Sequence, residues 1–345
     1  MFAAVRIVLI HFLPMSVTHQ EIADRAGVSR TLVTRTLHGT HGARVSEETR
    51  QAILKVAREL GYQPRSFTTY NIGYVGNSDT LFLAGESRFL LLTDKALRQA
   101  GFRLVLTSVD RDGKPVLSEV LNPKTVDGVI FSRWFGSAIH QTLPAKMPWV
   151  VLSDEDEIPV TVDKVTMDTV ATTERIAAHL IENGHRHLCI LANPSTGNVT
   201  THMHVGIRQA LAKAGLPEIV SSIEVTADSQ IAMPLKVKMR QQNAPTAFVT
   251  FGAEKTVTLL NILNAYGYRV PQDVSLVSLL DSHLLEPLMP PIMATTAMGP
   301  DVAQQAVARL LEKIQNPASP PKHIYIPGEL IYRPSVATVK VKQNI

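Results

Sequence analysis

Hydrophobic and polar residues recur with two different periods along the chain, and the first sixty residues show the helical one. Thr18 and Glu21 have the S/T-x-x-E spacing of a capping box, which predicts that a helix begins there. Ile22, Ala23 and Ala26 give this helix a single apolar face. The pattern therefore predicts a short amphipathic helix near the start of the chain.

Two more helices are predicted directly after the first. Gly27 is expected to end the first helix, because glycine adopts a left-handed backbone at little cost. Ser29 would cap a second helix, in which Val33 and Leu37 face inward. Ser46 would cap a third, whose inner face consists of Ile53, Val56, Ala57 and Leu60. A helix, a glycine-bearing turn and a helix at this spacing are typical of the helix-turn-helix, which places its second helix in the DNA major groove.

The outward side of the second helix carries residues suited to reading base pairs. Arginine pairs with O6 and N7 of guanine, and threonine bonds a base edge or contacts a thymine methyl. Thr34 is equally suited to a phosphate contact, which would only fix position. The candidate DNA-binding residues are Thr18, Ser29, Arg30, Thr31, Thr34, Arg35 and His38. The alternative is a purely structural three-helix unit with solvated arginines.

The distribution of charge favours DNA binding. Residues 1–65 hold nine Lys and Arg against five Asp and Glu, a net charge of +4. Residues 66–345 hold 25 of each and are neutral overall. The whole positive excess of the chain therefore lies in the segment with the helix-turn-helix pattern, as expected for a surface that contacts phosphates.

Beyond Asn71, short apolar runs are separated by helical patterns. The runs expected as strands are NIGYVG, FRLVLTSV, DGVIFS and WVVLS, followed by LCILA, SIEVT, AFVTF and VSLVSLL. Helical patterns cover Leu90–Ala100, Asp168–Glu182, His204–Ala214 and Glu254–Ala265. Alternation of strand and helix predicts parallel sheets with helices on both faces, and two such series predict two lobes of similar build.

The residues from Val17 to Pro64 follow a known pattern: V-T-x-x-x-I-A-x-x-A-G-V-S, continued by V-S-x-x-T-R and A-x-x-L-G-Y-x-P. Further similar stretches are Ala177–Leu191, Val270–Asp281, Thr295–Met298 and Ile326–Ser335. Through these stretches, which span roughly residues 17–336, the chain resembles the LacI/GalR family of transcription regulators. The resemblance implies an all-α helix-turn-helix head and an α/β two-lobed, periplasmic-binding-protein-like body with parallel sheets.

The resemblance also implies a function. The chain is expected to be a cytoplasmic, sequence-specific transcription regulator, with repression favoured over activation. It would bind a pseudo-palindromic operator of double-stranded DNA as a homodimer, because the two-fold symmetry of a dimer is mirrored in its site. A small-molecule effector between the lobes would change the spacing of the heads. A solute-binding protein of a transport system, which shares the body fold, is the alternative; the head and the absence of an export signal count against it.

The patterns divide the chain into four segments. Residues 1–14 are apolar but fall short of the ~20 residues of a membrane span, and a start codon called too early, with Met15 as the true start, explains them better. Residues 15–64 form the head, 65–70 a short linker, and 71–345 the body that binds effector and dimerises. The resemblance implies crossovers near Asp163 and Ile292. Lobe 1 would then hold about residues 71–163 and 293–322, and lobe 2 about 164–292 and 323–338.

The linker departs from the family. Family members join head and body through a hinge helix of the form N-x-x-A-x-x-L, which inserts a leucine into the minor groove. Here Arg65–Tyr70 reads RSFTTY, without the alanine and the leucine, and a β-branched, aromatic hexapeptide is a poor isolated helix. We therefore expect no leucine wedge, and half-sites read mainly through the major groove.

The effector site is expected between the lobes, because ligands of open α/β sheets bind beyond the carboxyl ends of the strands. Arg133 beside Trp134 is the most suggestive pair, since charge and stacking would hold an anion or a ring. The candidate effector-binding residues are Asn77, Asp79, Arg133, Trp134, Asp154, His202, Phe251 and Asp281. For each of them a solvated loop position is the alternative.

Several polar groups that sugar-binding family members use are replaced here. Met203 stands in place of an arginine, Gly252–Ala253 in place of an Asn-Asp pair, and Leu280 in place of an acidic residue. A sugar effector held by the usual contacts is therefore not expected. The alternatives are a more apolar effector or a body that serves only to dimerise.

Neither an enzyme nor a metal site is expected. The chain lacks G-x-G-x-x-G, P-loop, H-E-x-x-H and G-x-S-x-G motifs. The single Cys189 stands in an apolar strand, which indicates a core position. The pairs His185/His187 and His202/His204 do not supply the three or four convergent ligands of a metal site. We expect no cofactor.

Overall fold

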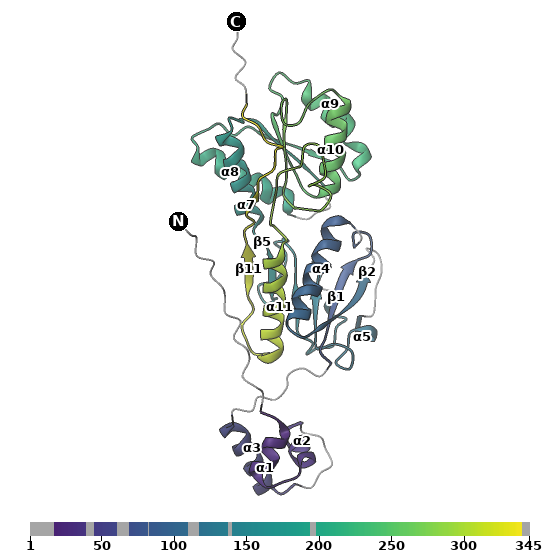
Figure 1. The fold of residues 1–345 in the computed structure, drawn as a ribbon, viewed down its shortest axis with the longest axis vertical. Helices are drawn as coiled ribbons and strands as arrows, with labels where there is room; N and C mark the ends of the chain where they lie inside the picture. The colour runs from purple at the N-terminus through teal and green to yellow at the C-terminus, as the bar shows by residue number, and fades with distance from the viewer. Residues whose placement is uncertain are drawn as a thin grey trace. The chain divides into compact units, whose positions relative to one another are not determined.

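The computed structural model describes residues 17–38, 45–60, 69–81, 83–109, 117–136, 140–193 and 198–339. The chain forms two compact units, Met1–Ser66 and Phe67–Ile345. They contain the head and the body (Figure 1), and each is treated by itself. The expected N-terminal extension, residues 1–14, lies outside the described residues, as does most of the linker, residues 65–68.

The head consists of α1 (His19–Ala26), α2 (Arg30–His38) and α3 (Glu47–Glu59). The predicted capping box is present at the start of α1, where Thr18 and Glu21 bond each other's backbone and side chain. Gly27 ends α1 with a φ of 67°, as predicted. The helices enclose a small core of Ile22, Ala23, Val33, Ile53 and Ala57.

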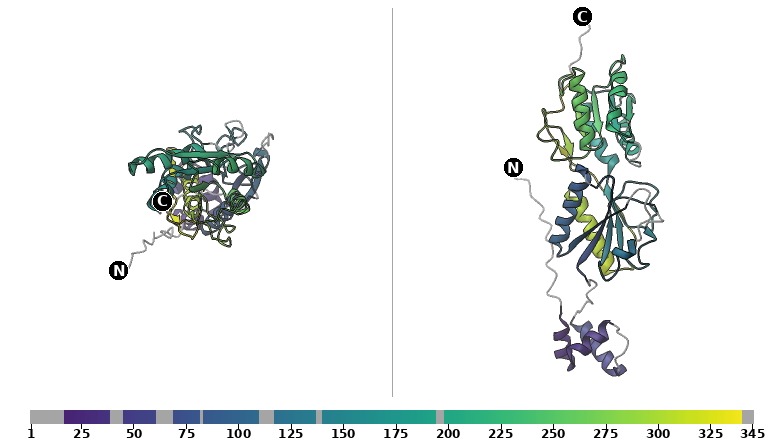
Figure 2. Two further views of the ribbon diagram at one scale, coloured as in Figure 1. Left: turned by 90° about the horizontal axis from the view of Figure 1, so that it is seen from above. Right: turned by 90° about the vertical axis from the view of Figure 1, so that its right-hand side faces the viewer.

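The first lobe of the body is built on a six-stranded sheet in the order β11-β5-β4-β3-β1-β2, in which each neighbouring pair is parallel. The helices α4 (Ala84–Gln99) and α11 (Pro300–Gln315) pack against each other and cover one face of this sheet (Figures 1 and 2). On the other face, the short helix α5 (Leu117–Val120) and neighbouring loops close a second core. The strands are β1 (Asn71–Asn77), β2 (Arg103–Val109), β3 (Gly128–Phe131), β4 (Trp149–Val151), β5 (Lys164–Met167) and β11 (His323–Ile326).

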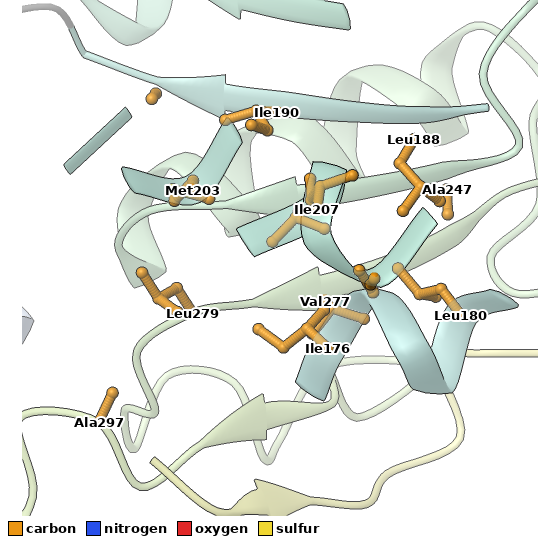
Figure 3. Packing of buried hydrophobic residues seen from close by; sticks show 14 of the residues in the cluster. Ile176, Leu180, Leu188, Ile190, Met203, Ile207, Ala247, Val277, Leu279 and Ala297 are labelled. Atoms are coloured by element: carbon orange, nitrogen blue, oxygen red, sulfur yellow. The ribbon is translucent and has the colours of Figure 1, made fainter. Parts of the chain in front are cut away.

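The second lobe contains a four-stranded parallel sheet in the order β7-β6-β8-β9. Side chains alternate across its strands, so that α7 (Thr169–Glu182) and α8 (Val199–Lys213) pack on one face, and α9 (Ala232–Met239) and α10 (Ala253–Ala265) on the other. Figure 3 shows Ile176 of α7 and Met203 and Ile207 of α8 among the side chains of the first face. The strands are β6 (Leu188–Ala192), β7 (Val220–Glu224), β8 (Ala247–Thr250) and β9 (Ser275–Ser278), with a 3-10 turn η2 (Asp228–Gln230) before α9.

The described chain passes between the lobes three times: from β5 to α7, from β10 (Ala294–Thr295) to α11, and from β11 to β12 (Leu330–Ile331). The strands β10 and β12 pair with each other in antiparallel fashion. Gly328 lies in the last passage, and a Cβ there would come within 2.8 Å of Ala297 N. The backbones of the crossing segments are therefore closely packed.

The expected lobe boundaries were wrong by one strand on each passage. Residues 164–167 and 323–326 were assigned to the second lobe, but both are strands of the first sheet, where β5 pairs with β4 and β11. The crossing expected near Ile292 comes after β10. An apolar run predicts a strand but not its pairing partner. The lobe of each run could therefore be inferred only from its order along the chain.

Candidate nucleic-acid interface and ligand cleft

The helix α2 presents a polar face. Arg30, Thr31 and Arg35 are exposed, whereas Val33 is fully buried in the core of the head. Ser29 stands at the N-terminal end of α2, where its Oγ accepts a hydrogen bond from the Leu32 backbone N–H at 3.2 Å. This is the arrangement in which a recognition helix offers its first turns to base edges.

Two other predicted DNA-binding residues have partners inside the head. The Thr18 hydroxyl takes part in the capping box. The Thr34 hydroxyl donates to the Arg30 carbonyl at 2.9 Å and lies 2.9 Å from His19 Nδ1, which links α1 and α2. His38 is the last residue of α2. Among the candidate side chains that the structure describes, Arg30, Thr31 and Arg35 are therefore the exposed ones without a role in capping or in linking the helices of the head.

A cleft of about 1090 Å³ lies between the two lobes of the body. In each sheet the strand order reverses between two strands, β1 and β3 in the first and β6 and β8 in the second. Asn77 ends β1, Ser132 follows β3, Asn193 follows β6 and Phe251 follows β8, and all four line the cleft. Ligands bind at such switch points in doubly wound sheets. The switch points of both sheets face the same cleft.

The structure brings six of the eight predicted effector-site residues together. Asn77, Asp79, Arg133, Trp134, Asp154 and Phe251 line the cleft. His202 and Asp281 are not among its lining residues. Asp281 instead accepts a hydrogen bond from Arg333 Nη1 at 2.7 Å, and Arg88 Nη1 donates to its carbonyl at 3.0 Å. Arg88 comes from α4 of the first lobe, so Asp281 joins the two lobes.

His202 also joins the lobes. It lies on α8, and its Nδ1 and Nε2 are 2.9 Å from Asp154 Oδ2 and 3.3 Å from Asp156 Oδ2, both after β4. Asn198 donates to the same Asp156 oxygen at 2.7 Å, and the Thr169 hydroxyl donates to Asp154 at 2.6 Å. The hydrogen bond to Asp154 is the main reason why the pKa of His202 is raised.

Arg133 and Trp134, the pair expected to hold an anion or a ring, already have partners in the protein. Arg133 Nη2 lies 3.4 Å from Glu155 Oε1. The Trp134 ring stacks on His140 at 4.2 Å between centroids, and His140 stacks in turn on Trp149 at 4.6 Å. The arginine charge is therefore balanced by Glu155, and one side of the indole is covered.

The strand-end rule missed several charged residues of the cleft. Glu155 directly follows Asp154 after β4, so the rule that selected Asp154 should have included it. Glu86 and Lys255 project from the helices α4 and α10, and Asp228 from η2. Such residues enter the cleft through the tertiary packing of helices on sheets, for which no strand-end signal exists.

His185, His187 and Cys189 of the second lobe have contacts inside this lobe. His185 donates from Nε2 to the Ala337 carbonyl at 3.2 Å with Thr246 Oγ1 2.9 Å from Nδ1, and burial lowers its pKa to about 4. His187 contacts Asn243 O at 2.7 Å and Ser221 Oγ at 2.8 Å. Cys189 is fully buried, which raises the pKa of its thiol to about 11. Across the described residues, no three His, Cys, Asp or Glu side chains converge as metal ligands do, and no helix is long and apolar enough to cross a membrane.

Two family models match this protein, one over the head and one over the body. Residues 18–65 match the model of bacterial regulatory proteins of the lacI family, and residues 177–336 match the periplasmic binding protein-like domain. The protein therefore has a lacI-type helix-turn-helix head joined to a periplasmic-binding-protein-like body. The match to the lacI family covers the head, and the match to the periplasmic binding protein-like domain covers most of the second lobe and the C-terminal part of the body.

Relatives match nearly the whole chain. The HTH-type transcriptional regulator DegA of Bacillus subtilis (strain 168) is 26% identical, over 94% of this chain and 99% of its own length. The HTH-type transcriptional regulator CelR of Thermobifida fusca is 29% identical, over 92% and 98%. Similar proteins are thus transcriptional regulators, and some, such as PurR of Actinobacillus pleuropneumoniae, are repressors.

Solved structures agree with the fold. A complex of the transcriptional regulator CelR with cellobiose has a TM-score of 0.66 and 26% identity, covering 92% of this chain and 99% of that one. The lac repressor dimer bound to operator and an anti-inducer has a TM-score of 0.65 and 22% identity, over 94% and 100%. At that identity the second likeness shows the fold alone.

Proposed function

We propose that the protein is a cytoplasmic, sequence-specific DNA-binding transcription regulator that acts as a repressor. The observation that carries the proposal is the exposure of Arg30, Thr31 and Arg35 on α2, directly after an N-cap serine, in a head that matches the lacI family. Arginine and threonine at these positions suit guanine and thymine edges in the major groove. The net charge of +4 in residues 1–65 adds attraction to phosphates.

We further propose that two copies bind a pseudo-palindromic operator, one head on each half-site. Support comes from the head itself, since a single three-helix unit reads only a few base pairs and a two-fold dimer doubles the contact. The lac repressor, which shares the fold, is a dimer on its operator. With residues 65–70 in place of the family's hinge segment, we expect the head, residues 15–64, to read its half-site through the major groove.

The body is proposed to hold a small-molecule effector in the cleft between the lobes. The cleft combines the switch points of both sheets, and its walls come from both lobes, so a ligand there contacts the two lobes at once. A ligand that binds one lobe arrangement better than another shifts the balance between them. That shift would be passed to the heads as a coupling of a few kcal/mol at most.

Genome-wide footprinting of the full chain on DNA from its source organism tests the proposal. We expect discrete palindromic sites, which disappear for the double variant Arg30→Ala/Arg35→Ala. Each site would be retested as a short duplex by titration at two salt concentrations, because phosphate contacts weaken with salt whereas base contacts distinguish sequences. Binding that is sensitive to salt but equal on all sequences would contradict a sequence-specific regulator.

A further inference from the structure

We propose that the effector is a cation: a small ring compound with a protonated amine, whose positive group meets Glu86 in the wall of the cleft. The proposal rests on the proposed function of the cleft as the effector site and adds the chemical class of the ligand. From the sequence, Arg133 and Trp134 were expected to hold an anion or a ring; the proposal keeps the ring and replaces the negative charge with a positive one.

The walls of the cleft are acidic. Among the described residues that line it, six are carboxylates and two are cationic. The carboxylates are Asp79, Glu86, Asp154, Glu155, Asp228 and Glu254; the cations are Arg133 and Lys255. Walls that carry one sign of charge around a low-dielectric space concentrate ligands of the opposite sign. An anionic ligand would enter against this field.

The two cations of the cleft are engaged with carboxylates of the cleft. Lys255 Nζ lies 2.7 Å from Asp228 Oδ1, and Arg133 Nη2 lies 3.4 Å from Glu155 Oε1. Asp154 accepts from Thr169 and faces His202, as described above. Both cations of the cleft are thus paired with carboxylates of the cleft. Neither Glu86 nor Asp79 takes part in these contacts.

Glu86 is the carboxylate of the cleft that we expect to contact the positive group of the ligand. It projects from the first turn of α4 into the cleft, and its Oε2 is fully enclosed without a hydrogen-bond donor of normal geometry in the described part of the chain. Burial raises the pKa of Glu86, and the Thr80 hydroxyl and the Arg133 charge offset only part of this effect. Burial disfavours the ionised form of Glu86. A positively charged donor beside it would favour that form, because charge-assisted hydrogen bonds are the stronger kind.

Aromatic side chains in the same cleft suit the ring. Phe251 enters from the second lobe after β8, and Trp134 follows β3 in the first lobe, with the face of its ring away from His140 uncovered by that stack. Ring faces attract cations and pack against other rings. A ligand with an amine at one end and a ring at the other therefore has a partner for each part.

The test uses three probes with one skeleton, measured by calorimetric titration of the full chain. Tyramine carries an amine, 4-(2-hydroxyethyl)phenol a neutral hydroxyl, and 4-hydroxyphenylacetate a carboxylate. Cellobiose serves as a fourth, polyhydroxyl probe. We expect tyramine to bind at least about tenfold more tightly than the neutral analogue, the step that one charge-assisted hydrogen bond supplies. The carboxylate probe should bind least.

Glu86→Gln keeps the size of the side chain and removes the charge. It should abolish the preference for tyramine over the neutral analogue, whereas Glu119→Gln, an exposed glutamate on α5 outside the cleft, should leave the preference unchanged. A preference that survives in Glu86→Gln, tighter binding of cellobiose or of the carboxylate, or no binding of tyramine would each overturn the proposal. Footprinting of the same variants reports separately on DNA binding, so failure of the proposed function is recognised independently.

Discussion

His202 Nδ1 of α8 lies 2.9 Å from Asp154 Oδ2, and the two residues belong to different lobes of the body. Asp154 also forms part of the cleft wall. The pair therefore connects the lining of the cleft to a contact that holds the lobes together. A ligand that binds Asp154 would compete with His202 for this carboxylate. Binding in the cleft would then weaken a contact between the two lobes.

The His202 contact predicts a pH dependence of stability. Its pKa is raised above the ordinary value of 6.5, so the folded protein binds this proton more tightly than the unfolded chain does. The stabilisation is complete below that ordinary value and is lost as the pH rises through the raised pKa. Urea denaturation over the neutral range should show this loss, and His202→Gln should remove it.

His204→Gln is the matched control, because His204 lies on the same helix and burial lowers its pKa. That variant should keep the loss of stability with rising pH. An unchanged pH dependence in His202→Gln would show that the contact with Asp154 does not stabilise the lobe arrangement.

Arg35→Ala should weaken binding to a footprinted site by about 1–3 kcal/mol, the contribution of one bidentate base contact. Arg35 is exposed on α2 and is not needed for the core of the head. Fluorescence anisotropy with a labelled duplex measures the loss, with Arg103→Ala on the surface of the body as control. An equal loss on random DNA would make Arg35 a phosphate contact.

Asp163→Ala should lower the free energy of unfolding by about 3–5 kcal/mol, because it removes the buried partner of Arg309 and leaves this charge only the more exposed Glu312, 2.9 Å away. Arg309 is 2% exposed, and its Nε lies 2.6 Å from Asp163 Oδ1. The control is Glu329→Gln, which removes a half-exposed pair with Arg175 and should change stability by less than about 1 kcal/mol. Similar losses of unfolding free energy in both variants, measured by urea denaturation, would show that the buried pair stabilises the fold no more than the exposed pair.

Gly206→Ala should destabilise the second lobe by about 1–3 kcal/mol, the usual effect of overpacking. A Cβ on Gly206 would lie 2.5 Å from Val170 O and 2.9 Å from Glu174 N, so α7 and α8 would have to separate. Gly85→Ala on α4 is the control, since the nearest atom to its Cβ would be 3.9 Å away. Thermal unfolding should show a lower midpoint for Gly206→Ala and an equal or higher one for Gly85→Ala.

The sequence alone determined the elements that depend on local rules. The capping box at Thr18, the left-handed Gly27 and the inward Val33 depend on spacings within a few residues, so the head was predictable as a unit. The alternating apolar runs of the body likewise predicted parallel strands and two lobes. Six cleft residues followed from one topological rule, because parallel strands end at the same edge of a sheet.

Only the tertiary structure decided which groups meet across long separations in the chain. It assigned β5 and β11 to the first sheet, moved Asp281 and His202 out of the cleft wall and into contacts between lobes, and paired Arg133 with Glu155. It also placed Glu86, from a helix, in an acidic cleft. Strand pairing, ion pairing and burial depend on the packing of segments that are distant in sequence, so no local pattern of residues encodes them.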